Sequence, residues 1–376
     1  MKRILVLFLS LTLLMLSGCW DLLIIEDLAL ALAMGIDQHP EDPEKFIFTV
    51  TNPTFSETAV DETRKIAVEA YSLANAFFNA QQQRNRLLVL GQVSTILFSE
   101  EAARSGLMHE VMRQVDQQRD MNPNVKIVVV QGSSAQEALY LEPVEEARVA
   151  QHLNDLLEQN FNSGFMPRIT GSRYWFRYST PGLDPVVPVI ELTGGEEKKG
   201  IQIVGLGAFC PDGKLGGVLS NQQAVVGMLL SGQHRRTRIF SQLNIGGVRR
   251  KTSYFVKNAK SRVDTEIVNN RAKIAIQLDL AVDVVNIDWG VEVLDRNVEE
   301  VIETALANEI QGTLKNKIVT IKNWGADSLG LGQYVRIQNH KWFEQIDWNE
   351  EFGKSDIAVQ VNVSVKRIGT LIKPNY

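Results

Sequence analysis

The amino-acid sequence predicts a multi-domain protein of mixed α/β fold, with an α+β C-terminal region in which an antiparallel sheet is packed with helices. Three observations support this fold class. Strand-like and helix-like segments alternate through the first half of the chain, as in α/β domains. A long pattern of alternating apolar residues covers 272–284, and an apolar stripe at helical spacing follows it. The 376 residues, 44% hydrophobic and 22% charged, are enough for two or three packed domains.

The first half contains three strand–helix pairs. Ser72 is the expected N-cap of the first helix, and Ser99 opens the second. In chain order the expected elements are a strand at 46–51, a helix at 72–85, a strand at 93–98, a helix at 99–119, a strand at 125–130 and a helix at 144–159.

The second half is richer in strands. The turn signal Pro211-Asp212-Gly213-Lys214 predicts a hairpin between strands at 201–209 and 215–219. A short helix is expected at 221–230, several strands between 239 and 285, a helix at 296–322 and a final alternating strand at 357–365. The even-numbered apolar residues of 272–284 are expected to pack against the apolar stripe of the long helix in one core.

The predicted domain boundary is a glycine-flanked charged segment, Gly194 to Gly200. The charge balance changes there: residues 19–199 hold 15 basic and 26 acidic residues, whereas residues 200–376 hold 22 and 18. The expected organisation is a signal peptide at 1–18, an N-terminal domain at 19–193, a linker at 194–200 and a C-terminal domain at 201–376.

The N-terminus has the pattern of a secretory signal. Lys2 and Arg3 precede an apolar run over 4–16, which is too short to span the roughly 30 Å hydrocarbon core of a bilayer. The run ends in Leu16-Ser17-Gly18-Cys19, which resembles a bacterial lipobox. We therefore expect cleavage between Gly18 and Cys19, and a membrane lipid on Cys19 that holds the chain on the outer face of the cytoplasmic membrane.

Basic residues are concentrated between Asp212 and Asp264, where the sequence has no acid. A segment of one charge sign attracts acidic partners or anionic lipid headgroups. The alternative is an ordinary solvated sheet face. The candidate electrostatic contact residues are Arg235, Arg236, Arg238, Arg249, Arg250 and Lys251. Nucleic acid is not an expected partner, because the protein is exported and has a net charge of −5.

The sequence contains no recognisable catalytic or cofactor motif. The five histidines have no zinc-protease spacing, and Gly205-Leu206-Gly207 is followed by more strand rather than by a helix, unlike a phosphate-binding loop. Cys19 is assigned to the lipid, which leaves Cys210 as a small core residue rather than a reactive thiol. We therefore expect no metal, no cofactor and no enzymatic activity.

Three groups of short motifs are spaced along the chain. After the lipobox come Trp20-Asp21, Ile25-Glu26-Asp27-Leu28 and Gly35-Ile36-Asp37; the predicted hairpin holds Ala208-Phe209, Lys214-Leu215 and Gly217; the tail holds Gln311, Ala326-Asp327, Gly330-Leu331-Gly332, Trp342, Trp348 and Phe352. Their order resembles the Ger(x)C family, the lipoprotein C subunits of bacterial spore germinant receptors. Leucines at 22 and 23, where the family often has arginines, and Leu331, where it has phenylalanine, depart from the pattern.

This resemblance implies a mixed α/β protein without catalytic residues. It implies association with two integral membrane receptor subunits, an A-type and a transporter-like B-type, in the inner membrane of the spore. Two alternatives from other classes are a solute-binding lipoprotein of an uptake system, which needs a cleft between two similar lobes, and a cell-wall hydrolase, which needs a carboxylate or metal site.

The lipobox yields the first prediction. The Cys19→Ala variant lacks the thiol that accepts the lipid, so it should incorporate no labelled fatty acid and should leave the membrane fraction. Metabolic labelling followed by membrane fractionation measures both effects. Equal labelling of the wild type and the variant would contradict the assignment.

Overall fold

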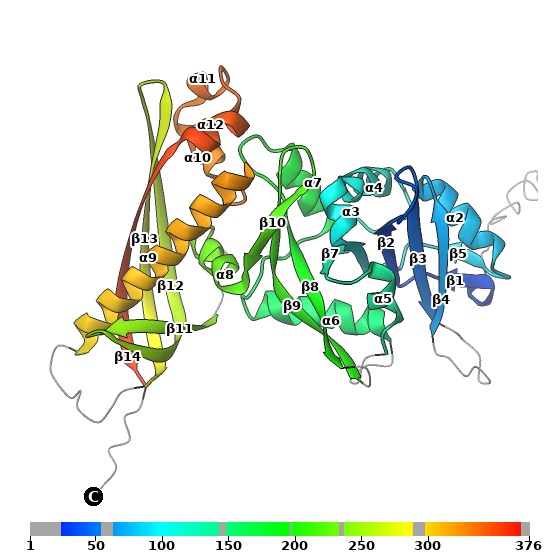
Figure 1. Ribbon diagram of the computed structural model, residues 1–376, viewed down its shortest axis with the longest axis horizontal. Coiled ribbons are helices and arrows are strands. Elements are labelled where there is room, and N and C mark those ends of the chain that lie inside the picture. The colour runs from blue at the N-terminus through cyan, green and yellow to red at the C-terminus, as the bar shows by residue number, and fades with distance from the viewer. Residues whose placement is uncertain are drawn as a thin grey trace, which may run out of the picture.

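The computed structural model describes residues 24–53, 63–142, 148–195, 198–232, 237–288 and 298–369. They form an elongated molecule with a large mixed sheet toward one end and a second, separate sheet at the other (Figure 1). The predicted mixed α/β fold is confirmed. Cys19 and the signal peptide, and also Arg235 and Arg236, lie outside the described residues.

The N-terminal sheet has eight strands. In spatial order they are β10 (Leu215–Ser220), β9 (Lys198–Phe209), β8 (Val186–Gly195), β7 (Lys126–Gln131), β6 (Thr95–Ser99), β2 (Ala33–Gln38), β3 (Phe46–Pro53) and β4 (Thr63–Ala70). The central strands β8, β7, β6 and β2 are parallel to one another, and antiparallel strands extend the sheet at both edges.

Helices cover both faces of this sheet. One core packs the sheet against α2 (Leu73–Gln82), α3 (Glu100–Ser105), α4 (Leu107–Asp116) and α7 (Gly171–Ser179), and the other packs it against α5 (Ala135–Tyr140) and α6 (Val149–Asn162). Strand β7 supplies both cores, Ile127 and Val129 to the first and Val128 and Val130 to the second. Burial on both faces explains why this strand is continuously apolar in the sequence.

The helix caps follow the sequence. The side chain of Ser72 accepts a hydrogen bond from the backbone N–H of Asn75, at 3.2 Å, and Ser99 caps α3 in the same way. The helix expected over 99–119 is instead two helices, because Gly106 lies between them with a φ of +95°. A left-handed residue of this kind ends a helix.

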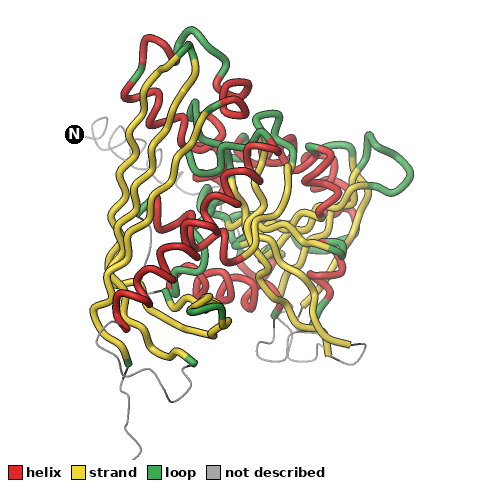
Figure 2. Tube along the Cα trace, turned by 60° about the vertical axis from the view of Figure 1, so that its left-hand side comes forward, coloured by secondary structure: helices red, strands yellow, loops and turns green. Residues whose placement is uncertain are grey.

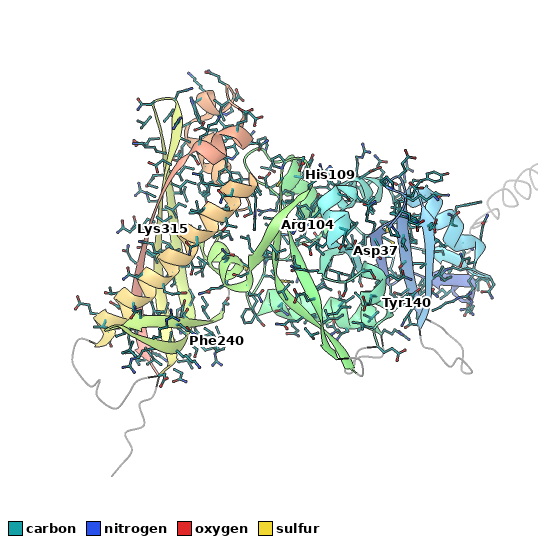
Figure 3. The ribbon with its side chains drawn as sticks, in the orientation of Figure 1. Asp37, Arg104, His109, Tyr140, Phe240 and Lys315 are labelled. Atoms are coloured by element: carbon teal, nitrogen blue, oxygen red, sulfur yellow. The ribbon has the colours of Figure 1, made fainter. Side chains whose placement is uncertain are left out.

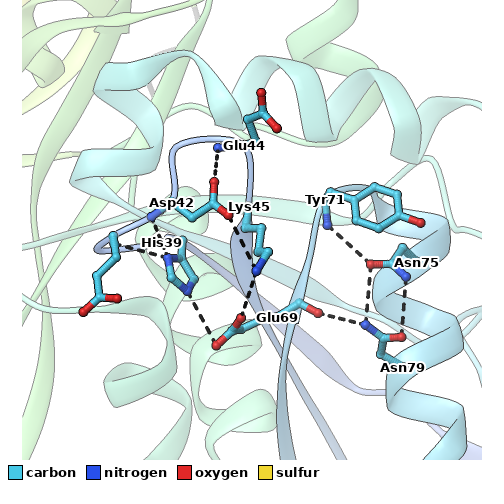
Figure 4. Close-up of polar contacts among 9 residues, drawn as sticks. His39, Asp42, Glu44, Lys45, Glu69, Tyr71, Asn75 and Asn79 are labelled. Carbon is cyan, nitrogen blue, oxygen red and sulfur yellow. Dashed lines mark hydrogen bonds and ion pairs between the residues drawn. The ribbon is translucent and has the colours of Figure 1, made fainter.

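Surface polar contacts hold the β2–β3 turn against β4 and α2 (Figure 4). The Nδ1 atom of His39 accepts the backbone N–H of Asp42 at 2.9 Å, and its Nε2 lies 3.5 Å from the carboxylate of Glu69, which also forms an ion pair with Lys45 at 3.6 Å. Asn79 of α2 donates to the carbonyl of Glu69. Because Glu69 is exposed, these contacts add little stability and serve mainly to position the turn.

The segment proposed as a linker is part of a hairpin. Strands β8 and β9 pair antiparallel along their whole length, and the register continues to Gly194 opposite Lys199 and Gly195 opposite Lys198. Strands β9 and β10 therefore belong to the N-terminal sheet, so residues 194–200 do not separate two domains in space. Glycine and charge are equally typical of a hairpin end and of a linker, which is why the sequence suggested the boundary.

The C-terminal sheet has the order β11 (Arg238–Ile245), β12 (Val248–Val268), β13 (Arg271–Ile287), β14 (Asp356–Ile368). The first three strands are antiparallel, and β14 is parallel to β13 because the chain crosses over through a helical segment between them. Asn269 and Asn270, with φ of 53° and 59°, form the two-residue turn between β12 and β13. Positive φ at both positions is the type I′ geometry that suits a twisted hairpin.

Helices cover one face of this sheet. They are α8 (Asn221–Leu230), α9 (Val298–Trp324), α10 (Leu331–Gln338), α11 (His340–Phe343) and α12 (Trp348–Lys354). Figure 2 shows them on the side of the sheet that faces the rest of the molecule, with the opposite face outermost. Within the described part of the chain, no helix is both long and apolar enough to cross a membrane.

The predicted C-terminal core is confirmed. The even-numbered residues 272–284 of β13 and the α9 residues Ile302, Ile310, Leu314, Ile318 and Ile321 are buried in one cluster. The predicted stripe differs from the structure at two residues. Val301, which the stripe included, is 42% exposed, and Leu306, which it did not include, is fully buried.

This packing yields a stability prediction. Ile276→Ala and Ile302→Ala each remove a side chain that is at most 2% exposed, so each should lower the free energy of unfolding by about 2–5 kcal/mol. Val301→Ala, on the same helix but exposed, is the control and should unfold close to the wild type. Urea unfolding of the three variants measures this. Wild-type stability of both buried variants would contradict the assignment of the core.

Candidate functional site

The predicted basic residues are divided between the two faces of the C-terminal sheet. Cross-strand partners in an antiparallel pair share a face. Arg250 is paired with Leu243, which is fully buried beneath the helices, so Arg250 belongs to the helix-covered face. Its neighbours Arg249 and Lys251 are exposed on the outward face.

Strand β11 adds a cation and an aromatic ring to the outward face. Arg238 and Phe240 alternate with buried residues, and Phe240 is 67% exposed (Figure 3). The guanidinium of Arg238 lies 4.9 Å from the ring centre of Phe255. Four residues, Arg238, Phe240, Arg249 and Lys251, thus form what we call the outer basic patch.

In the folded protein, nearby acidic side chains partly neutralise the basic residues in the rest of the acid-free segment. Strand β13 brings Asp283 to within 3.3 Å of Lys257, and Asp264 lies 2.7 Å from Arg262. The absence of acids along the chain therefore overstated the charge of the surface. Among the described residues, no ion pair within 4 Å joins Arg238, Arg249 or Lys251 to an acid, so the net positive charge of this face is concentrated at its β11 end.

A buried polar junction joins the two sheets, and the tail motifs build it. The carboxylate of Asp327, 1% exposed, accepts the backbone N–H groups of Leu331 and Gly332 at 3.0 and 2.7 Å, and the indole N–H of Trp348 at 3.1 Å. One side chain thus caps the first turn of α10 and fixes α12 beside it.

The same loop is bonded to the N-terminal domain. The backbone N–H of Asp327 donates to the carboxylate of Asp184 at 2.5 Å, and the N–H of Asp184 donates to the carbonyl of Asp327 at 3.0 Å. Arg177 of α7 donates to the carbonyls of Asp184 and Ser328, at 2.9 and 2.7 Å. We call Arg177, Asp184 and Asp327 the interdomain clasp.

Two glycines allow the backbones to meet at the clasp. A Cβ added at Gly182 would lie 2.5 Å from the carbonyl carbon of Gly332, and one added at Gly332 would lie 2.4 Å from the indole nitrogen of Trp348. Such distances are far inside van der Waals contact. The motif Gly330-Leu331-Gly332 is therefore explained by close packing between the domains.

Burial shifts the ionisation of the clasp. Burial and the nearby Asp327 raise the pKa of Asp184 to about 7, and burial lowers the pKa of Arg177 to about 10. Burial also raises the pKa of Asp327, opposed by the N–H donors around it. Charges in such a site are costly without partners, and the hydrogen bonds of the clasp supply those partners.

The N-terminal motif has a similar structural role. Asp37 accepts the backbone N–H groups of Ala135 and Gln136 at 2.6 and 2.9 Å and so caps α5 (Figure 3). A Cβ at Gly35 would lie 2.9 Å from Leu139. Gly35 lets α5 lie close to β2, and Asp37 fixes where that helix begins.

The hairpin motif packs against the long helix of the other domain. A Cβ at Gly217 would lie 2.2 Å from the ring of Trp324, so this indole rests on the bare backbone of β10. The thiol of Cys210 donates to the carbonyl of Trp324 at 3.1 Å. Phe209 is fully buried and meets the ring of Tyr174 edge-on.

The described residues offer little for catalysis. They include no group of three or more His, Cys, Asp or Glu side chains placed to hold a metal ion. Burial raises the pKa of Cys210 to about 11, which makes its thiol a poor nucleophile at neutral pH. The ring of His109 is hydrogen-bonded to Tyr174 at 3.0 Å inside an aromatic cluster.

The sequence pattern indicated one of the three clasp residues. Asp327 is a motif residue, as are its hydrogen-bond partners Gly332 and Trp348, although the pattern gave none of them a role. Arg177 and Asp184 were missed, because a single arginine and a single aspartate carry no spacing signal. The available signal was Pro181-Gly182 before Asp184, a turn placed at the end of α7.

The glycine contacts predict opposite changes in stability when alanine replaces glycine at two positions. Gly332→Ala should lower the free energy of unfolding by about 1–3 kcal/mol or more, because neither Trp348 nor the backbone of Gly182 has room to move. Gly312→Ala is the matched control in α9, where nothing lies within 4 Å, and it should raise stability by about 0.5–1 kcal/mol. Urea unfolding measures both. A Gly332→Ala variant as stable as the wild type would show that the domains are not in contact there.

Asp184 gives a prediction about pH. Its pKa is about 7 in the folded protein and about 3.9 in an unfolded chain, so the folded state binds the proton more tightly. The resulting stabilisation is complete below about pH 4 and is lost as the pH rises through about 7. As the pH rises over this range, the wild type should therefore lose free energy of unfolding relative to Asp184→Asn. Urea unfolding from about pH 4.5 to about pH 7.5 tests it; a constant difference would exclude a raised pKa.

Comparison with known proteins agrees with the motifs. Residues 21–192 match the family described as spore germination protein N-terminal domain, and residues 204–369 match spore germination B3/GerAC like, C-terminal. The chain is 20% identical to spore germination protein KC of Bacillus subtilis (strain 168), over 99% of this chain and 97% of that protein. It is also 20% identical to spore germination protein YndF of the same organism, over 94% of each.

The fold is shared with a solved structure. The crystal structure of the GerBC protein superposes with a TM-score of 0.59 and 12% identity, covering 89% of this chain and 96% of that one. The first family match ends within β8 and the second begins within β9, and together they span most of the chain. Both matches, and the motif residues that build the clasp, show that this chain belongs to the Ger(x)C family of spore germination proteins.

Proposed function

We propose that this chain is the lipid-anchored, non-catalytic C subunit of a spore germinant receptor, needed for nutrient-triggered germination. The observation that carries the proposal is the family match across both domains. The use of the motif residues also supports it. Asp37, Gly217 and Asp327 all serve to hold helices and domains in fixed positions, as expected of a subunit that presents surfaces to partners.

The membrane attachment in this proposal depends on Cys19. A lipid at that residue places the chain on the outer face of the cytoplasmic membrane, which becomes the inner membrane of the spore. Anchoring raises the concentration of the protein against integral partners without any new contact. Those partners are the A-type and the transporter-like B-type receptor subunits.

A solute-binding lipoprotein is less consistent with the geometry. Such proteins close two similar lobes around a ligand by movement at a hinge. Here the two sheets differ in size and strand order, and the clasp buries hydrogen bonds between them. Opening that junction would expose Asp184 and Asp327 and break their bonds together.

Recovery of partners tests the proposal. Affinity capture of the lipidated protein from detergent-extracted spore membranes should bring down the A-type and B-type subunits. In a strain without a redundant paralogue, deletion of the gene should abolish the response to some nutrients and spare germination triggered without receptors. A normal nutrient response in that strain would overturn the proposal, as would hydrolysis of peptidoglycan by the purified protein.

The outer basic patch supplies a finer prediction. Replacing Arg238, Arg249 and Lys251 by Gln should reduce partner recovery, and the reduction should be greater at low than at high ionic strength, because salt screens exposed charges. Arg250→Gln is the matched control: it removes a charge from the same strand but from the opposite face. Equal effects of the two sets of changes would show that the patch has no specific role.

A further inference from the structure

The N-terminal end of the molecule carries an aliphatic surface that the core does not use. Strands β1 (Leu28–Leu30) and β5 (Leu87–Val89) form a two-stranded parallel sheet, with Leu28 opposite Leu87 and Leu30 opposite Val89. Residues that alternate along a strand point to opposite faces. Ala29 is 4% exposed, and Leu88 opposite it packs against the first core, so the other four point outward.

The residues before β1 extend this surface. Ile24 and Ile25 are 56% and 69% exposed, and Leu87 is 47% exposed. Leu28, Leu30 and Val89 are half-buried. We call these six residues, Ile24, Ile25, Leu28, Leu30, Leu87 and Val89, the aliphatic face. Contiguous exposed apolar residues of this kind mark contact with a membrane or a protein.

The position of the lipid decides between these occupants. Ile24 is the fifth residue after Cys19, and a fully extended chain spans at most about 3.6 Å per residue, so Ile24 stays within roughly 18 Å of the lipidated residue. The aliphatic face is therefore held at the bilayer surface. We propose that it inserts into the interfacial region of the bilayer as a second, non-covalent attachment, an inference that rests on the proposed lipid at Cys19.

The charges beside this surface indicate how it binds. Glu26 and Asp27 are exposed between Ile25 and Leu28 in the chain, and Arg86, directly before Leu87, is half-buried. The two acids outnumber the one base, so attraction to anionic headgroups does not drive the contact. Transfer of aliphatic side chains out of water drives it instead, and added salt should not release it.

Insertion at this end orients the whole molecule. Figure 1 shows β1 and β5 at the end of the long axis opposite the C-terminal sheet. With the aliphatic face in the bilayer, the outer basic patch is carried away from the lipid headgroups, and it faces protein partners above the membrane.

Depth-dependent fluorescence quenching tests the inference on the full lipidated chain. In a Cys210→Ala background, single cysteines replace Ile25 or Leu87. Ile337 in α10 and Val319 in α9, which are 79% and 58% exposed in the C-terminal domain and lie outside the outer basic patch, serve as controls. Each is labelled with an environment-sensitive fluorophore. The proteins are placed in vesicles of phosphatidylethanolamine and phosphatidylglycerol, with or without lipids that carry a nitroxide quencher.

The labels at 25 and 87 should lose fluorescence by about twofold or more, in low and in high salt, and those at 337 and 319 should not change. Three other outcomes overturn the inference: no quenching at 25 and 87 in protein that floats with the vesicles, equal quenching at all four positions, or a response at 25 and 87 only when receptor subunits are added. In each of these the anchor itself stands. Failure of the anchor itself is a separate result. If mass spectrometry finds no fatty acid on Cys19, both the proposed anchor and the inference that rests on it are wrong.

Discussion

The arrangement of the two domains depends on the buried hydrogen bonds of one residue, Asp327. It is bonded through its side chain to α10 and α12, and through its backbone to Asp184, which lies between α7 and β8. Because these partners are buried, none of them can exchange its bond for water when the loop moves. The glycines at 182 and 332 then bring the chains close enough for the bonds to form. The result is a molecule in which surfaces on separate sheets hold fixed relative positions, as the proposed role in a receptor requires.

Local pattern was enough to predict most of the elements. The strand over 272–284 and the helix opposite it were evident because each buries one face, and burial of one face imposes a period of 2 or 3.6 on the sequence. Ser72 and Ser99 marked helix starts, because a side-chain oxygen there satisfies a free backbone N–H. These signals are local, and they require no knowledge of what lies across the core.

The errors concern arrangement in space. The glycine-flanked charges at 194–200 have the composition of a linker, but their role depends on whether the flanking strands pair, and pairing is a contact between β8 and β9 that composition does not record. In the same way, the acid-free run after Asp212 indicated a uniformly basic surface. Because side chains alternate between the two faces of a strand, Arg250 lies on the helix-covered face, and Asp283 of the neighbouring strand β13 forms an ion pair with Lys257.

The residues that identify the family are mostly interior, so they determine the fold rather than the choice of partner. Gly35, Asp37, Gly217, Asp327 and Gly332 each fill a position where a side chain would collide or a buried donor would be left unpaired, so substitution there damages the fold. The outward face of the C-terminal sheet is under a weaker constraint, because its exposed side chains are not packed in a core. The same scaffold can therefore be kept at about one-fifth identity to the relatives, while the residues on this face are free to differ. Under the proposed function, we expect the charge and aromatic content of the outer basic patch, rather than the motifs, to decide which receptor this subunit joins.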